Sequence, residues 1–243
     1  MRLPTGCPPL DRLLDGGLEA DAVTLVFGEG GSGKTNLALL CAREAALEGH
    51  RVAFVDTEGV SADRMAQVFG DDEAAMERLL FFTPFAIGEQ ERMVQKATLL
   101  QDLGLVVVDS INMHYRLYID GDGQAEREAG RSLYKQLHHL TNFARRHGVP
   151  VLVTGQVFGT EDATQPFARR TMEHLVKASV RFEKRPDGAR RATVVKHRSI
   201  QEGRQALFRI GAHGLEPVGG AGPAEPGAGR EAGPDPPADG PGT

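Results

Sequence analysis

The chain has 243 residues, of which 40% are apolar and 25% are charged, and its formal net charge is −5. This length suits one α/β domain, and the acidic balance argues mildly against a constitutive nucleic-acid binder. The two cysteines, Cys7 and Cys41, stand far apart and indicate neither a disulfide scaffold nor a zinc site. No apolar run approaches the ~18 residues of a membrane span. We therefore expect a cytoplasmic protein with no membrane partner.

Strand-like and helix-like patterns alternate along the first two thirds of the chain. Short apolar runs indicate buried strands, and longer stretches with apolar residues every three or four positions indicate helices. Strands are predicted at 23–27, 51–56, 79–82, 105–109 and 150–154, and helices at 35–47, 88–103 and 127–147. This alternation predicts an α/β fold with a largely parallel sheet flanked by helices.

The last third of the chain has a different pattern. The segments 179–184 and 190–196 flank Pro186-Asp187-Gly188, a turn sequence that predicts a β-hairpin, and 206–210 is a further strand. The sheet should therefore carry antiparallel strands at its C-terminal edge.

The composition changes again at the end of the chain. From 217 to 243 Gly, Pro and Ala dominate, with no large apolar residue after an early valine. Such a segment cannot bury enough apolar surface to offset the entropy lost on ordering. We expect one ATPase core over 1–216 and a disordered tail over 217–243.

A complete phosphate-loop motif follows the first predicted strand and opens the first predicted helix. Glycines let the backbone wrap a phosphate with its N–H groups pointing inward, and the helix N-terminus adds partial positive charge. The lysine of the motif reaches the β- and γ-phosphates, and the threonine hydroxyl ligates Mg²⁺. The motif predicts ATP and Mg²⁺ as cofactors, bound by Gly28, Glu29, Gly30, Gly31, Ser32, Gly33, Lys34 and Thr35.

Two carboxylates at strand ends are candidates for the chemistry. Asp109 ends the apolar run 105–109, where a second Mg²⁺ ligand is expected, and Ser110 follows it. Glu58 follows the strand 51–56, which we expect beside the phosphate-loop strand, and it is a candidate to activate water. A surface carboxylate with no catalytic role is the alternative for Glu58.

These residues together resemble the RecA/RadA family of ATPases. The resemblance covers about residues 3–217, and the segments 196–199 and 208–210 look most like the short archaeal branch called RadB. It rests on these segments: Thr5-Gly6-Cys7-Pro8-Pro9-Leu10-Asp11, Gly16-Gly17-Leu18, the phosphate loop, Val55-Asp56-Thr57-Glu58-Gly59, Val107-Val108-Asp109-Ser110, Val151-Leu152-Val153-Thr154-Gly155-Gln156-Val157, Lys196-His197-Arg198-Ser199 and Phe208-Arg209-Ile210.

The resemblance implies a role for several residues. Glu58 matches the catalytic glutamate of the family, and Arg64 matches an arginine that stacks on adenine. Gln156 matches the residue that senses the γ-phosphate and couples it to a DNA-binding loop. Lys196 and Arg198 match basic residues presented to the ATP of a neighbouring subunit, which implies a homo-oligomer. A solvated basic strand is the alternative for these last two.

The chain also departs from the family pattern. It lacks the Phe-x-x-Ala polymerisation motif and an N-terminal helical domain, so we do not expect RadA-like filaments. Ala168-Arg169 stands where a Gly-Gly pair is usual, and Gly155 stands where Asn usually precedes the glutamine.

The resemblance and a local excess of basic residues predict contact with single-stranded DNA. Candidate contacts are Arg169 and Arg170, in the loop 157–171 and its flank, and Arg116, in the position of the first DNA loop. The implied function is a slow ATPase that assists a RadA-like recombinase in DNA repair. The alternative is a KaiC-like signalling ATPase with protein clients and no DNA role.

Overall fold

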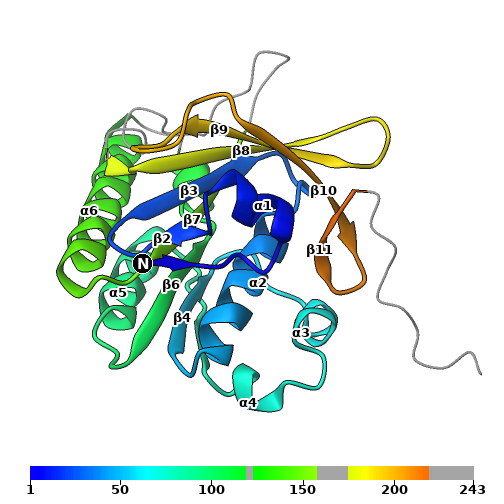
Figure 1. The fold of residues 1–243 in the computed structure, drawn as a ribbon. Helices are drawn as coiled ribbons and strands as arrows, with labels where there is room; N and C mark the ends of the chain where they lie inside the picture. Colours follow the sequence, from blue (N-terminus) through cyan, green and yellow to red (C-terminus); the bar gives the residue numbers. More distant parts are fainter. Residues whose placement is uncertain (119–122, 158–174, 219–243) are drawn as a thin grey trace, which may run out of the picture.

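The computed structural model describes residues 1–118, 123–157 and 175–218. Within these residues, nine strands form one sheet in the order β11-β10-β9-β8-β3-β7-β6-β4-β5 (Figure 1). The strands from β8 to β5 are parallel, and β9, β10 and β11 are each antiparallel to their neighbours. The predicted fold class, a largely parallel sheet with an antiparallel C-terminal edge, is confirmed.

The strands are β1 (Arg2–Leu3), β2 (Leu18–Glu19), β3 (Val23–Gly28), β4 (Arg51–Asp56), β5 (Leu79–Phe82), β6 (Leu103–Asp109), β7 (Val151–Gln156), β8 (Ala178–Lys184), β9 (Arg190–Lys196), β10 (Gln205–Gly211) and β11 (Gly214–Pro217). The helices are α1 (Pro8–Leu13), α2 (Lys34–Leu47), α3 (Ala62–Phe69), α4 (Glu73–Met76), α5 (Ile87–Ala97) and α6 (Gly123–His147), with a 3-10 turn, η1 (Tyr115–Tyr118). β1 and β2 pair as a separate antiparallel ribbon.

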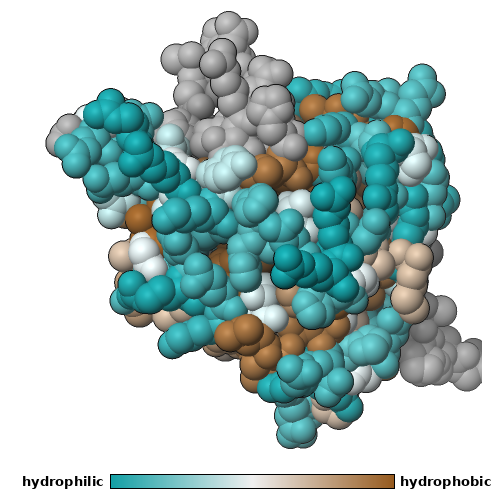
Figure 2. Space-filling model, turned by 90° about the vertical axis from the view of Figure 1, so that its left-hand side faces the viewer, coloured by the Kyte–Doolittle hydropathy of each residue, from teal (hydrophilic) through white to brown (hydrophobic). Residues whose placement is uncertain are grey.

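Helices cover both faces of the sheet, so the central strands are buried on both sides. Successive residues of β6 point to opposite faces: Leu105 and Val107 join the core beneath α2, while Val106 and Val108 join the core beneath α5 and α6. Helices α1 to α4 lie on the first face (Figure 1). Figure 2 shows the side of the molecule where α5 and α6 lie, and its surface is mostly hydrophilic with small hydrophobic areas.

Two expectations about the elements were wrong. The helix predicted over 88–103 ends at Ala97, because Asp102 adopts a left-handed turn (φ 59°) and Leu103 already belongs to β6. The strand 51–56 does not lie beside the phosphate-loop strand, because β7 and β6 stand between β3 and β4. β4 is as buried as the two strands that separate it from β3, so apolar runs alone do not fix the order of strands within the sheet.

The limits of the described chain bear on two further predictions. None of the helices in the described ranges is long and apolar enough to cross a membrane. The predicted tail over 217–243 lies outside the described residues except for Pro217, which ends β11, and Val218.

Candidate functional site: a phosphate loop at the carboxyl edge of the sheet

The phosphate loop runs from the end of β3 to the start of α2, and glycine is required at several of its positions. Gly31 and Gly33 adopt left-handed backbone conformations, with φ of 72° and 105°. A Cβ added to Gly28 would lie 2.1 Å from the carbonyl oxygen of Phe182 on the neighbouring strand β8. The loop can therefore turn tightly against the sheet and present its N–H groups to an anion.

Lys34 occupies the interior of this loop. Its Nζ donates to the carbonyl oxygens of Gly28, at 3.0 Å, and Glu29, at 2.9 Å. Burial lowers the pKa of Lys34, and the negative charges of Glu58 and Asp109 oppose that shift. The ammonium group is thus held by two neutral acceptors in a place where phosphate oxygens would bind it more strongly.

Asp109 lies at the end of β6 and is 1% exposed. It accepts a hydrogen bond from the hydroxyl of Thr154, and the nearby Thr35 hydroxyl also favours its charged form, yet burial raises its pKa from 3.8 to about 6. Its Oδ2 is buried without a hydrogen-bond partner among the described residues. An unpaired carboxylate oxygen close to the Thr35 hydroxyl suits the hard oxygen ligands that Mg²⁺ prefers, and Mg²⁺ binding by Asp109 and Thr35 remains a prediction.

Glu58 reaches the site from β4 in spite of the two intervening strands. Gln156, at the end of β7, donates from Nε2 to Glu58 Oε1 at 2.7 Å. Asp56 accepts from the backbone N–H groups of Glu58, Gly59 and Val60, at 3.1, 2.8 and 2.7 Å. This turn projects Glu58 from the end of the strand, and it brings the predicted catalytic pair into contact.

Sequence reasoning missed two residues that shape this site. Asp56 ends a predicted strand, and a carboxylate just before a Thr-Glu-Gly turn is a signal for side-chain capping of backbone N–H groups. Asn112, three residues after Asp109, bonds to the backbone of Gln156. Local sequence gives no signal for that contact, because 44 positions separate the two residues.

Arg64 lies in α3 and is half-buried. Its guanidinium is 3.4 Å from the carbonyl oxygen of Gly211, at the turn between β10 and β11. The side chain therefore bridges α3 and the antiparallel edge of the sheet. Its expected stacking on adenine remains a prediction.

Lys196 and Arg198 lie at the amino ends of the parallel strands, whereas the phosphate loop of the same chain lies at their carboxyl ends. Lys196 pairs with Ser179 at the start of β8, which runs parallel to β3, and its Nζ donates to the carbonyl oxygen of Val176 at 3.0 Å. Arg198 forms ion pairs with Asp21 and with Glu19, the latter at 2.7 Å. The hydrogen bond with Arg198 lowers the pKa of Asp21.

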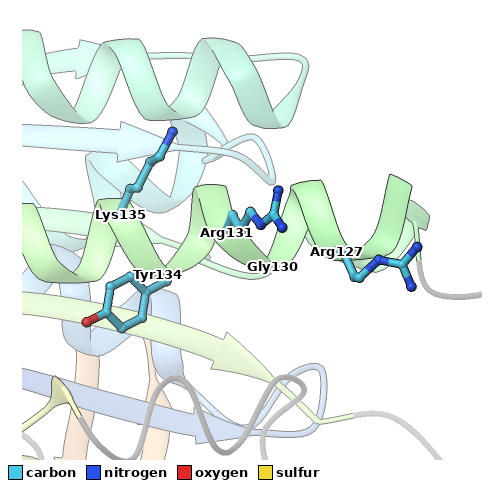
Figure 3. A pocket seen from close by; sticks show the side chains of 5 residues that line it. All are labelled: Arg127, Gly130, Arg131, Tyr134 and Lys135. Atoms are coloured by element: carbon cyan, nitrogen blue, oxygen red, sulfur yellow. The ribbon is translucent and has the colours of Figure 1, made fainter. Parts of the chain in front are cut away.

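Only one of the three predicted DNA contacts falls within the described residues. Arg116 is exposed in η1, whereas Arg169 and Arg170, with the loop around them, lie outside the described chain. Tyr115 of η1 is buried and packs beside Gly130 of α6. A surface hollow on α6 next to this turn is lined by Arg127, Gly130, Arg131, Tyr134 and Lys135 (Figure 3).

The strand order, the phosphate loop after β3 and the carboxylate at the end of β6 define a P-loop protein with a RecA-like core. A model of the Rad51 family matches residues 1–218. The chain belongs to the Rad51 family and, within it, to the RadB proteins.

The similarity to individual RadB proteins extends over most of the chain. The DNA repair and recombination protein RadB of Thermoplasma acidophilum is 38% identical over 215 residues, which is 86% of this chain and 91% of that protein. RadB of Methanococcoides burtonii is 36% identical over 88% of this chain and 97% of its own length. A crystal structure of the RadB recombinase matches with a TM-score of 0.75 at 38% identity, over 89% of this chain and 99% of that one.

Proposed function

We propose that this protein binds Mg-ATP and hydrolyses it slowly, binds single-stranded DNA, and assists or regulates a RadA-like recombinase in DNA repair. The observation that carries the proposal is the contact between Glu58 and Gln156 beside the phosphate loop. It joins a candidate general base to a candidate γ-phosphate sensor. Membership of a family of recombination ATPases supports the same function.

Each residue of the site has a separate role in the proposed hydrolysis. The loop N–H groups and Lys34 bind the phosphates, and Thr35 and Asp109 would hold Mg²⁺, which supplies positive charge to the phosphate oxygens. Glu58 orients the attacking water and accepts its proton. Gln156 keeps Glu58 aligned and exchanges this contact for the γ-phosphate when ATP is bound.

Slow turnover follows from the placement of the remaining basic groups. Lys196 and Arg198 lie far from the phosphate loop of their own chain. They can therefore reach only the ATP of a second protomer, whose phosphate loop stacks against the amino ends of these strands. We infer that an isolated protomer lacks part of the charge that stabilises the transition state.

The DNA-binding surface that we propose extends from η1 onto α6. On α6 the exposed side chains of Arg127, Arg131 and Lys135 follow one another at four-residue spacing, and Tyr134 is half-exposed and points to the other side of the helix from Lys135 (Figure 3). Basic side chains attract the phosphate backbone, and an aromatic ring offers a surface on which a base stacks. Arg116 lies on the adjoining turn.

Fluorescence anisotropy of a labelled single-stranded oligonucleotide, with and without Mg-ATP across a salt series, tests the proposal. We expect weak, salt-sensitive binding that Mg-ATP alters in the wild type. The variant Lys34→Ala should bind DNA without responding to nucleotide. Arg127→Ala/Arg131→Ala should weaken binding and reduce its salt dependence, whereas Arg51→Ala, at the amino end of β4, should not.

The outcomes separate the proposed function from the signalling alternative. DNA binding that responds to nucleotide supports the recombination role, and a RadA-like recombinase is then the next partner to test. No binding at low salt contradicts the DNA-binding proposal and leaves a nucleotide-switched protein with protein clients as the better description.

A further inference from the structure

On the side of β6, strand β7 has no paired strand residue at its last position, Gln156, within the described residues. β6 pairs with β7 through Val108 and Val153, and one more backbone bond joins the N–H of Ile111 to the carbonyl oxygen of Thr154 at 2.9 Å. The chain of β6 then turns away. On the other side Gln156 is still in register with Gly28 of β3.

The side chain of Asn112 takes the place of the missing strand. Its Nδ2 donates to the carbonyl oxygen of Gln156 at 2.9 Å, and its Oδ1 accepts from the N–H of Gln156 at 3.0 Å. One amide therefore satisfies both backbone groups of one residue, as a strand neighbour would. Asn112 is fully buried, so these bonds are shielded from water.

The segment that carries Asn112 is itself fixed from the helix side. Gln90 of α5 is fully buried and donates to the carbonyl oxygen of Ile111 at 2.9 Å and to Gln136 of α6 at 3.0 Å. The position of the Asn112 amide is therefore set by packing on α5 and α6.

Gly155 leaves room for this arrangement. A Cβ at this position would lie 3.5 Å from Leu25 and 3.7 and 3.8 Å from the two amide atoms of Asn112. A longer side chain at 155 would compete with the Asn112 amide for the same space. The glycine before Gln156 and the asparagine in the turn after β6 are thus complementary.

We propose that Asn112 is a positioning residue for ATP hydrolysis. It holds the backbone of Gln156 so that the Gln156 side chain meets Glu58. In this role Asn112 acts through Gln156, the residue to which its amide is bonded. This inference rests on the proposed ATPase function.

A double-mutant cycle in the full-length protein tests this dependence. Asn112→Ala should lower kcat for Mg-ATP about tenfold, the effect of two lost hydrogen bonds, while nucleotide affinity stays within about twofold. Gln156→Ala should lower kcat at least as much. The double variant should be no slower than Gln156→Ala alone, because Asn112 has no other route to the site. Losses that multiply in the double variant overturn the proposal.

Asn112→Leu separates hydrogen bonding from packing, because leucine restores the volume but not the amide. It should lose as much kcat as Asn112→Ala, and turnover at the wild-type rate overturns the proposal. Thr141→Val is the control for stability, since Thr141 is a buried, hydrogen-bonded residue of α6. It should lower the melting temperature without changing kcat.

Amide hydrogen exchange of Gln156 in the nucleotide-free protein gives a readout that needs no activity. The N–H of Gln156 should be strongly protected, and it should exchange faster in Asn112→Ala. Fast exchange in the wild type overturns the positioning role. If the protein shows this protection but hydrolyses no ATP, the proposed function is refuted, whereas the hydrogen bonding of Gln156 by Asn112 is established.

Discussion

Asp109 and Lys34 are both ionisable, both buried and both necessary to the proposed chemistry. Removing a charge from water costs free energy, which is why burial raises the pKa of Asp109 and lowers that of Lys34. The loop carbonyls and two threonine hydroxyls offset only part of this cost. At the residue scale, the site is therefore prepared for a ligand at the expense of stability.

Asp109→Asn should separate binding from stability. It should weaken Mg²⁺-dependent nucleotide binding, since one metal ligand loses its charge. It should also raise the stability of the nucleotide-free protein at pH 7 by about 1–3 kcal/mol, because no buried carboxylate remains to ionise. Calorimetric titration with and without EDTA, together with denaturant unfolding, measures both effects. A less stable variant would contradict the prediction.

Glu58→Gln should abolish most turnover without preventing binding. Glutamine keeps the size of the side chain and a hydrogen bond with Gln156, but it cannot accept a proton from water. We expect kcat to fall about 10²–10⁴-fold while nucleotide affinity changes little. Phosphate-release and nucleotide-binding assays check this. Glu73→Gln, an exposed carboxylate of α4, serves as the control and should keep wild-type turnover.

At the scale of elements, α5 and α6 are joined by polar contacts as well as by apolar packing. The hydroxyl oxygen of Thr98, the residue that caps the C-terminus of α5, lies 2.7 Å from Nε2 of His139 on α6. Ser132 of α6 donates to Glu91 of α5 at 2.6 Å. The same two helices fix the segment of Asn112, so their packing bears on the site.

His139 should make the stability of this helix pair depend on pH. Burial, with the nearby His138, lowers the pKa of His139 below its ordinary value of 6.5. The unfolded chain thus binds the proton more tightly than the folded chain. The stability that the neutral His139 contributes is therefore intact above pH 6.5 and is lost as the pH falls below it. His139→Gln should flatten the fall in melting temperature over this range. His213→Gln, exposed between β10 and β11, should not, and equal slopes would contradict the assignment.

The candidate site and the basic residue Arg198 lie at opposite ends of the parallel strands in the whole molecule. The phosphate loop, Asp109 and Glu58 lie at the carboxyl edge of the parallel strands, where open α/β sheets bind ligands. Arg198 lies at the amino edge of β3, paired with Asp21 and Glu19. Head-to-tail stacking of protomers would place the phosphate loop of one protomer against the Arg198 end of the next.

A mixing experiment tests whether the two edges cooperate. Lys34→Ala and the double variant Lys196→Ala/Arg198→Ala should each be nearly inactive. An equal mixture should recover up to about a quarter of the wild-type activity, since random assembly pairs an intact phosphate loop with an intact basic edge at that frequency. ATP hydrolysis measured across protein concentrations checks this. A mixture no more active than its components would argue against action between subunits.

Much of this molecule was determined by local sequence. The phosphate loop, the carboxylate of Asp109 and the hairpin over β8 and β9 are encoded in short segments, because glycine conformations, apolar runs and turn residues act within a few positions. The parallel sheet with an antiparallel edge followed from the order of those segments.

Tertiary structure alone decided the rest. The sequence did not show that β7 and β6 separate β3 from β4, because strand order depends on which surfaces are buried and not on any single strand. It did not show that Asn112 clamps Gln156 across 44 positions. Nor did it show that Arg198 pairs with Asp21 across 177 positions. Such contacts depend on the packed positions of distant segments, and no local periodicity records them.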